Sequence, residues 1–282
     1  MTLDNLFFAG LNVLLAWSVY LALLAGSLSF AQGAFMALGC YGAGVLTVKF
    51  GLPLLPATLI AALGTAAIAA LLGYPALRLR GIYLILVTLG ITFCVRVLLE
   101  NVAYVGGVAG FGGMVGADLQ AVLIAVVIVG GLLLWLSYSP LQRVFDAVRE
   151  DDRVAAAMGI HVTRIRLMGF AAGAAIAAVA GSLYGHYMNF VRPESFDVML
   201  SVYVVLYVVL GGVNNMWGPL IGATVMTLLP EYFRVLADWR PTVFGLAILL
   251  LLLFRPEGLL SFRTRTNRAT PRTPRKSPAK TP

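Results

Sequence analysis

The sequence predicts an all-α fold, a polytopic transmembrane helical bundle of about eight or nine spans. Three observations support this prediction: hydrophobic residues make up 60% of the 282 residues, charged residues only 11%, and the mean hydropathy is +0.92. A soluble domain carries roughly 25% charged residues. The composition therefore excludes an ordinary soluble enzyme, a disordered chain and a disulfide scaffold.

The apolar segments can be assigned as spans in chain order. A helix that crosses a hydrocarbon core of about 30 Å needs roughly 20 apolar residues. The predicted spans are residues 6–25, 30–48, 54–74, 82–99, 120–138, 165–187, 201–210, 219–229 and 241–254. The seventh and eighth are too short to cross as straight helices, so residues 211–218 between them are expected to form an unwound or re-entrant turn. No basic residue precedes Lys49, so the first span is not expected to be a cleaved signal peptide.

Lysine and arginine residues predict how these spans are oriented. Fifteen of the 20 fall on one side of the predicted bundle, and cytoplasmic loops are the ones that carry such an excess. The loop at residues 139–164 and the C-terminus are therefore expected in the cytoplasm. With an odd number of spans, the N-terminus faces outward. Arg96 lies one helical turn before Glu100 near the outer end of its span, where it can either pair with Glu100 or extend toward the membrane surface.

The end of the chain differs in composition from the rest. Residues 263–282 contain seven Lys or Arg, four Pro and no acidic residue, which predicts a disordered basic cytoplasmic tail after a transmembrane domain at residues 1–262. A basic tail beside a membrane is expected to contact anionic lipid headgroups, not nucleic acid. Cys40 and Cys94 lie in apolar segments, and the two histidines have no carboxylates near them, so no metal site and no cofactor is expected.

Charged residues concentrate in the predicted cytoplasmic loop. Seven of them lie within eleven residues, at Arg143, Asp146, Arg149, Glu150, Asp151, Asp152 and Arg153. Apolar residues of the same segment follow the i, i+3, i+4, i+7 spacing of one helix face, at Leu141, Val144, Phe145 and Val148. Asp151 or Asp152 can cap a second short helix at residues 152–158, and Gly159 can end it. The loop is either a solvated interfacial helix or a docking site for a soluble partner.

The segment from Arg143 to Ile160 resembles the corresponding loop of the LivM-type permeases, which belong to bacterial ABC importers for branched-chain amino acids. In that family this loop docks on the ATPase subunit. Further similar segments are residues 29–35, 80–83, 209–213, 217–223 and 254–259. Together these segments cover residues 10–262 in the family's order.

The resemblance implies an ABC importer permease of the type II-like kind in a bacterial inner membrane. The implied partners are two ATP-binding subunits, a second permease of the LivH type or a second copy of this chain, and an extracytoplasmic substrate-binding protein. The implied coupling residues are Arg143, Asp146, Arg149, Glu150, Asp151, Asp152 and Gly159. The sequence contains no Gly-x4-Gly-Lys-Ser/Thr motif. ATP is therefore expected to be hydrolysed by a separate subunit, and no catalytic residue is expected in this chain.

Two polar interruptions of the apolar segments predict a translocation path. Gln32 lies in one of them, and Asn214 and Asn215 lie in the other. Inside a bilayer, a non-helical stretch persists only where protein or a water-filled cavity satisfies its N–H and C=O groups. Paired interruptions in the two halves of a transporter point to a central pathway. A simple cytoplasmic turn at the two asparagines explains the second interruption equally well.

Three other functions remain open from the residues alone. A permease for an amide, urea or another amino acid fits the same pattern. A secondary carrier needs ion or proton sites at the midplane, where the chain offers only the neutral side chains at 32, 214 and 215. A membrane enzyme could use Glu150, Asp151 and Asp152 as acid, base or metal ligands, but no nucleophile accompanies them.

Overall fold

The computed structural model describes residues 3–79, 81–213, 215–232 and 245. Its helices are α1 (Leu3–Leu24), α2 (Gln32–Val48), α3 (Leu54–Ala76), α4 (Ile82–Asn101), α5 (Leu119–Tyr138), α6 (Pro140–Glu150), α7 (Asp152–Ala157), α8 (Val162–Met188), α9 (Val198–Gly211) and α10 (Trp217–Tyr232). Its short elements are the 3-10 turns η1 (Ala103–Val105), η2 (Gly107–Ala109) and η3 (Pro193–Phe196), and the antiparallel strands β1 (Phe111–Gly112) and β2 (Phe190–Val191). The predicted span at 241–254, except for Gly245, and the predicted tail at 263–282 lie outside the described residues.

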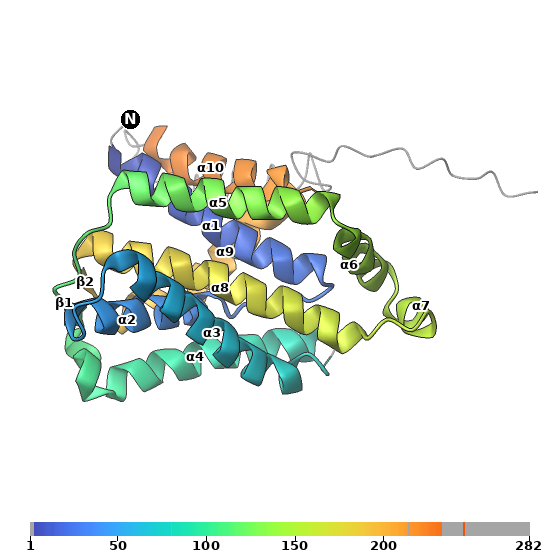
Figure 1. Ribbon diagram of the computed structural model, residues 1–282, viewed down its shortest axis with the longest axis horizontal. Helices are drawn as coiled ribbons and strands as arrows, with labels where there is room; N and C mark the ends of the chain where they lie inside the picture. The colour runs from blue at the N-terminus through green and yellow to red at the C-terminus, as the bar shows by residue number, and fades with distance from the viewer. Residues whose placement is uncertain (1–2, 80, 214, 233–244, 246–282) are drawn as a thin grey trace, which may run out of the picture.

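The long helices run roughly side by side, and the two ends of the bundle differ (Figure 1). The short helices α6 and α7 project from one end, which is termed the α6–α7 end. The small sheet of β1 and β2 lies at the other, termed the β-sheet end. Helix α1 begins at the β-sheet end, and α5 leads directly into α6. This arrangement agrees with the predicted all-α bundle.

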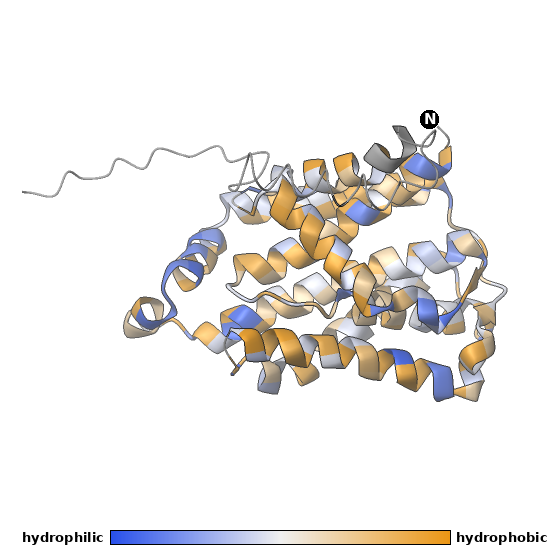
Figure 2. Ribbon diagram, turned by 180° about the vertical axis from the view of Figure 1, so that it is seen from behind, coloured by the Kyte–Doolittle hydropathy of each residue, from blue (hydrophilic) through white to orange (hydrophobic). Residues whose placement is uncertain are grey.

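The exterior of the bundle is suited to lipid. Within the described part of the chain, six helical stretches are long and apolar enough to cross a membrane, and α2 and residues 217–228 of α10 are apolar but shorter. The outer helices expose large apolar side chains, so that Leu71 of α3 is 74% exposed and Val127 of α5 is 73% exposed. Figure 2 shows apolar residues along the length of the bundle and hydrophilic ones concentrated toward its ends. The chain is a multi-pass membrane protein, as its composition predicts.

Helices α1, α2 and α8 pack backbone to backbone at the centre of the bundle. A Cβ atom added at Gly181 of α8 would overlap the backbone oxygen of Met36 in α2. One added at Gly173 of α8 would overlap the backbone oxygen of Ser18 in α1, and one at Gly39 of α2 would overlap the backbone of α8. Small residues at these positions permit the close approach.

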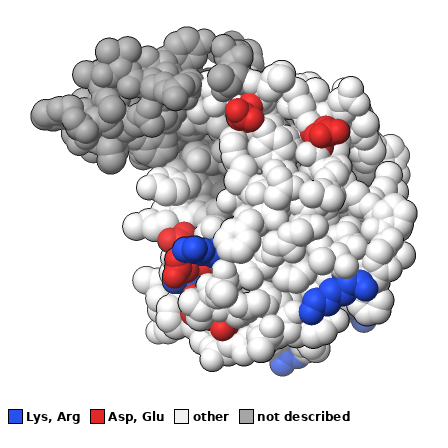
Figure 3. Space-filling model, turned by 90° about the vertical axis from the view of Figure 1, so that its left-hand side faces the viewer, with Lys and Arg blue, Asp and Glu red and all other residues white. Residues whose placement is uncertain are grey.

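Cationic side chains lie at both ends of the described bundle. Arg78 at the end of α3 and Arg164 at the start of α8 line one cavity at the α6–α7 end. Lys49 lies at the β-sheet end, where its Nζ is 3.2 Å from the ring centroid of Tyr104. The view onto that end shows a few scattered charged side chains among the described residues (Figure 3). Separately, Arg96 pairs with Glu100, because Arg96 Nε and Glu100 Oε1 are 2.9 Å apart.

Two predicted spans are shorter than the helices that the structure shows at those positions. Residues 201–210 correspond to α9, which begins at Val198 because Asp197 caps it: Asp197 Oδ1 accepts a hydrogen bond of 3.0 Å from Leu200 N. Residues 219–229 correspond to α10, whose backbone stays helical beyond the break in hydropathy at Pro230. Hydropathy marks where apolar side chains end, whereas capping decides where a helix begins.

Candidate functional site

Helix α6 is a short amphipathic helix that lies against the end of the bundle. It begins at Pro140, where Ser139 Oγ accepts a hydrogen bond of 3.0 Å from Leu141 N. Phe145 and Val148 of the predicted apolar stripe are buried, which confirms the face inferred from their spacing. The opposite face carries the exposed Arg143, Asp146 and Glu150 of the predicted coupling set.

Helix α7 is fixed at both of its ends. Asp151 Oδ1 accepts hydrogen bonds from Arg153 N at 2.8 Å and from Val154 N at 3.2 Å. At the other end Gly159 has φ +85°, and Ile160 N donates to Ala155 O at 3.1 Å. This pair of features is the glycine-terminated Schellman ending of a helix. The predicted capping and stop residues are therefore confirmed, with Asp151 as the cap.

Polar contacts join the α6–α7 unit to the membrane helices. Arg149 Nη1 donates to Val213 O at 3.2 Å, in the turn between α9 and α10. Asp152 Oδ2 lies 3.4 Å from Arg166 Nη2 in the first turns of α8. Together with Gly26, these charged groups line a cleft of about 310 Å³ beneath α6 and α7. A displacement of α6 would therefore be transmitted directly to the turn after α9 and to α8.

The fold shifts the pKa of Asp146, one of the predicted coupling residues. Partial burial of its carboxyl raises the pKa above the ordinary value, and the hydrogen bond of 3.1 Å from Gln142 Nε2 and the nearby Arg149 guanidinium oppose that rise. The carboxyl sits at the outer side of α6, four residues after Gln142.

Gln32 is the first residue of α2, and it follows a non-helical stretch held inside the bundle. Phe30 N donates to Thr88 Oγ1 of α4 at 3.1 Å, and Thr92 Oγ1 donates to Phe30 O at 2.9 Å. Gly33 N donates to Ser201 Oγ of α9 at 2.9 Å. Side chains of two other helices therefore satisfy the backbone of this interruption, as a stretch inside a bilayer requires.

Among the described residues, the amide oxygen of Gln32 lacks such a partner. Gln32 is 1% exposed, and within the described part of the chain its Oε1 has no hydrogen-bond partner. A buried acceptor without a partner costs about 1–3 kcal/mol. The structure therefore holds a buried amide oxygen without a partner at the first residue of α2.

Asn215 lies elsewhere, in the turn between α9 and α10 at the α6–α7 end. Val213 of this turn is bound by Arg149, and Met216 O accepts a hydrogen bond of 3.0 Å from Trp17 Nε1. Gly33 contacts Ser201, which is ten residues, or about 15 Å of helix, before the end of α9. The structure thus separates Asn215 from Gln32. Asn214 lies outside the described residues.

The comparison with known families gives a clear match over most of the chain. The family described as branched-chain amino acid transport system / permease component matches residues 1–255. The chain belongs to this family. This assignment agrees with the family that the motifs indicated.

The permease is similar to several proteins named as high-affinity branched-chain amino acid transport system permeases. LivM of Salmonella typhimurium and LivM of Escherichia coli are each 32% identical to it over 287 aligned residues, which cover 89% of this chain and 66% of the relative. LivH of Salmonella typhimurium is 30% identical over 148 residues, covering 50% of this chain and 47% of the relative. The chain thus spans just under two thirds of the length of the LivM relatives. No solved structure shows a significant match.

The structure also identifies permease residues that the sequence did not single out. Val154 of α7 and Met158, the residue that follows this helix, are 56% and 75% exposed, so the unit carries an apolar surface beside its charges. Their i, i+4 spacing on a short helix was the available signal. The hydroxyl groups that hold the interruption before Gln32 had no local signal, because each comes from a helix distant in sequence. Among the described residues, no group of three His, Cys, Asp or Glu could hold a metal ion.

Proposed function

We propose that the chain is the membrane-spanning permease subunit of an ATP-driven ABC importer for branched-chain amino acids in a bacterial inner membrane. The observation that carries the proposal is the α6–α7 unit, which projects from the bundle in a member of this permease family (Figure 1). Binding and hydrolysis of ATP then belong to separate subunits, and this chain supplies the route for the solute.

The docking of α6 and α7 on an ATP-binding subunit is supported by what they expose. Val154 and Met158 offer apolar contact area, and Arg143 and Glu150 offer charges around it. An apolar centre with a polar rim is the usual composition of a protein–protein interface. The inward-facing Arg149 and Asp152 link the same unit to the turn after α9 and to α8. Closure of an ATPase dimer on this surface would therefore move those helices.

The remaining partners follow from the same proposal. The α6–α7 end, with its excess of arginine, faces the cytoplasm, and the β-sheet end receives a substrate-binding protein outside. Two ATP-binding subunits serve two permeases, and the second permease is of the LivH type or a second copy of this chain. The similarity of the chain to both LivM and LivH of one organism supports a pair of related permeases.

The proposed route for the solute passes Gln32. Its amide oxygen is buried without a partner in the described part of the chain, beside hydroxyl groups of α4 and α9 that hold the neighbouring backbone. A neutral polar site among apolar helices suits a zwitterion with an aliphatic side chain. Asn215 belongs to the part of the proposed route nearest α6, and Asn214, which lies outside the described residues, remains a sequence-based candidate for the same route.

The docking proposal is tested by placing charge in the apolar surface of α7. The double variant Val154→Glu and Met158→Glu should reduce co-purification of the ATP-binding subunit about tenfold or more, because buried interface anchors carry most of the binding free energy. Val115→Glu is the matched control, since Val115 is 70% exposed at the β-sheet end. Equal recovery of the ATP-binding subunit with both variants would show that α7 is not the docking surface.

A further inference from the structure

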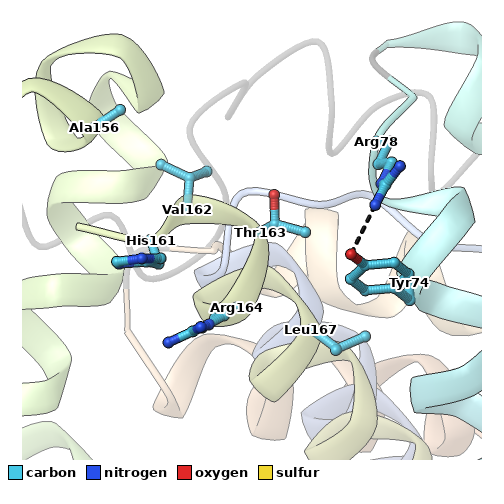
Figure 4. Close-up of a pocket in the computed structure, with 8 residues that line it drawn as sticks. All are labelled: Tyr74, Arg78, Ala156, His161, Val162, Thr163, Arg164 and Leu167. Carbon is cyan, nitrogen blue, oxygen red and sulfur yellow. Dashed lines mark hydrogen bonds between the residues drawn. The ribbon is translucent and has the colours of Figure 1, made fainter. Parts of the chain in front are cut away.

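A cavity of about 390 Å³ lies beside the α6–α7 unit, where α3 ends and α8 begins. Tyr74 and Arg78 line it from the end of α3, and His161, Thr163 and Arg164 line it from the start of α8. Figure 4 shows Arg78 and Tyr74 on one side, His161 and Arg164 on the other, and Thr163 between them. The described residues that line this cavity include two arginines and no carboxylate.

Arg78 is held in place without being neutralised. Its Nη2 donates to Tyr74 Oη at 2.7 Å, and its Cζ lies 4.6 Å from the centroid of the same ring (Figure 4). Among the described residues, neither Arg78 nor Arg164 forms an ion pair. A guanidinium ordered on an aromatic ring retains donors for a second partner, and bidentate binding of a phosphate is its characteristic use.

Arg164 is a second cation beside the cavity, and its position at the start of a helix is electrostatically unfavourable for a positive charge. It stands in the first turn of α8, where the helix dipole disfavours positive charge and where no acidic residue compensates it. An anion held between this turn and Arg78 would remove that penalty. The hydroxyl of Thr163 offers a further donor between the two arginines.

The surface around the cavity indicates that the anion carries acyl chains. Leu71 lies one turn before Tyr74 on the same face of α3 and is 74% exposed, and Tyr74 is 51% exposed. Met168, one turn after Arg164 on α8, is 51% exposed. Apolar surface therefore runs from the bundle to the rim of the cavity. A tyrosine at such a boundary is typical of the membrane interface.

We propose that the phosphodiester of an anionic phospholipid, such as phosphatidylglycerol, binds in this cavity between Arg78 and Arg164, with its acyl chains along α3 and α8. Ala156 of α7 also lines the cavity, so the bound headgroup touches the unit that is proposed to dock on the ATPase. The lipid would thereby support the position of α7. The binding site itself does not depend on which solute the permease carries.

The test uses the full chain purified in detergent and stripped of lipid. Phosphatidylglycerol, phosphatidylcholine or inorganic phosphate is added, and lipid retention is followed by native mass spectrometry together with the thermal unfolding midpoint. Phosphatidylglycerol alone should be retained and should raise the midpoint. Arg78→Gln should weaken this binding about fivefold, since one arginine beside a lipid phosphate contributes about that factor. Arg164→Gln is a second variant that should weaken binding in the same way.

Arg153→Gln is the matched control, because Arg153 is exposed on α7 but does not line the cavity. It should leave phosphatidylglycerol binding unchanged. If Arg153→Gln weakened phosphatidylglycerol binding as much as Arg78→Gln does, the lipid would be responding to the overall surface charge and not to this cavity. Equal stabilisation by inorganic phosphate would identify a site for a soluble anion, and equal retention of phosphatidylcholine would show lipid binding without headgroup recognition. Each of these results would overturn the proposal.

Discussion

Asp151 and Gly159 belong to the proposed docking unit, and each of them determines the conformation of α7. The carboxyl of Asp151 is used within α7, because it accepts the N–H groups of Arg153 and Val154. A Cβ atom added at Gly159 would have no neighbour within 4 Å, so space does not require glycine there. The φ of +85° does, because residues with a side chain rarely adopt it. Both residues define where a six-residue helix begins and ends. Their contribution to coupling is therefore expected to be indirect.

Replacing Gly159 by valine should uncouple transport from ATP hydrolysis while membrane insertion stays normal. A left-handed backbone costs an L-residue about 1–2 kcal/mol, and a helix as short as α7 has few other contacts to hold its end. Solute-stimulated ATPase activity of the assembled transporter should fall several-fold. Gly159→Asn is the control, because asparagine tolerates this conformation, and it should keep most of the activity. A loss as large with asparagine as with valine would mean that the lack of a side chain, and not the conformation, is what matters.

Features of the α6–α7 unit could be predicted from the sequence where they depend on neighbouring residues, and could not where they depend on residues far apart in the chain. The apolar stripe, the cap and the glycine stop are local patterns, so spacing alone located them. The contact from Arg149 to Val213 joins residues 64 positions apart, and no periodicity reveals such a pairing. The same reason explains why Gln32 could be predicted as an interruption while Thr88, Thr92 and Ser201 could not be predicted as its supports.

At the scale of elements, the non-helical stretch before α2 depends on its neighbours. Phe30 and Gly33 direct their backbone groups at hydroxyls of α4 and α9. These bonds connect three helices at one level of the bundle. The element is therefore a junction, and the positions of α4 and α9 relative to α2 depend on it.

Thr92→Val should weaken this junction with almost no change of side-chain volume. It removes the donor to the part-buried Phe30 O, and loss of such a partner costs up to about 1–3 kcal/mol. The thermal unfolding midpoint in detergent and the uptake rate should both fall. Thr224→Val is the matched control, because the Thr224 hydroxyl bonds only Leu220 O of its own helix among the described residues. If the two variants behaved alike, the junction would contribute nothing specific.

At the scale of the whole molecule, the two predicted polar interruptions occupy different levels. Gln32 lies inside the bundle, whereas Asn215 lies in the turn at the α6–α7 end. A route that includes both must therefore run along α9 toward α6. The turn at Asn215 is next to the residue bound by Arg149, so its opening is expected to follow movement of α6.

This proposed route predicts accessibility that depends on nucleotide. In a background without Cys40 and Cys94, Gln32→Cys should react with a water-soluble thiol reagent, and the rate should change when ATP is trapped in the partner subunit. Ala174→Cys, at a buried position of α8, is the control and should stay unreactive in both nucleotide states. A Gln32→Cys variant that resists labelling in both nucleotide states would remove this residue from the route.

The glycine contacts among α1, α2 and α8 have a consequence for the transport cycle. Where backbones touch, no side chain can change rotamer to let one helix slide past another, and the packed surfaces have no slack. These three helices are therefore expected to move as one rigid body. In the proposed transport cycle these three helices would then shift together when α6 and α7 move, and the polar junction beside Gln32 would be the hinge between this rigid group and the helices α4 and α9.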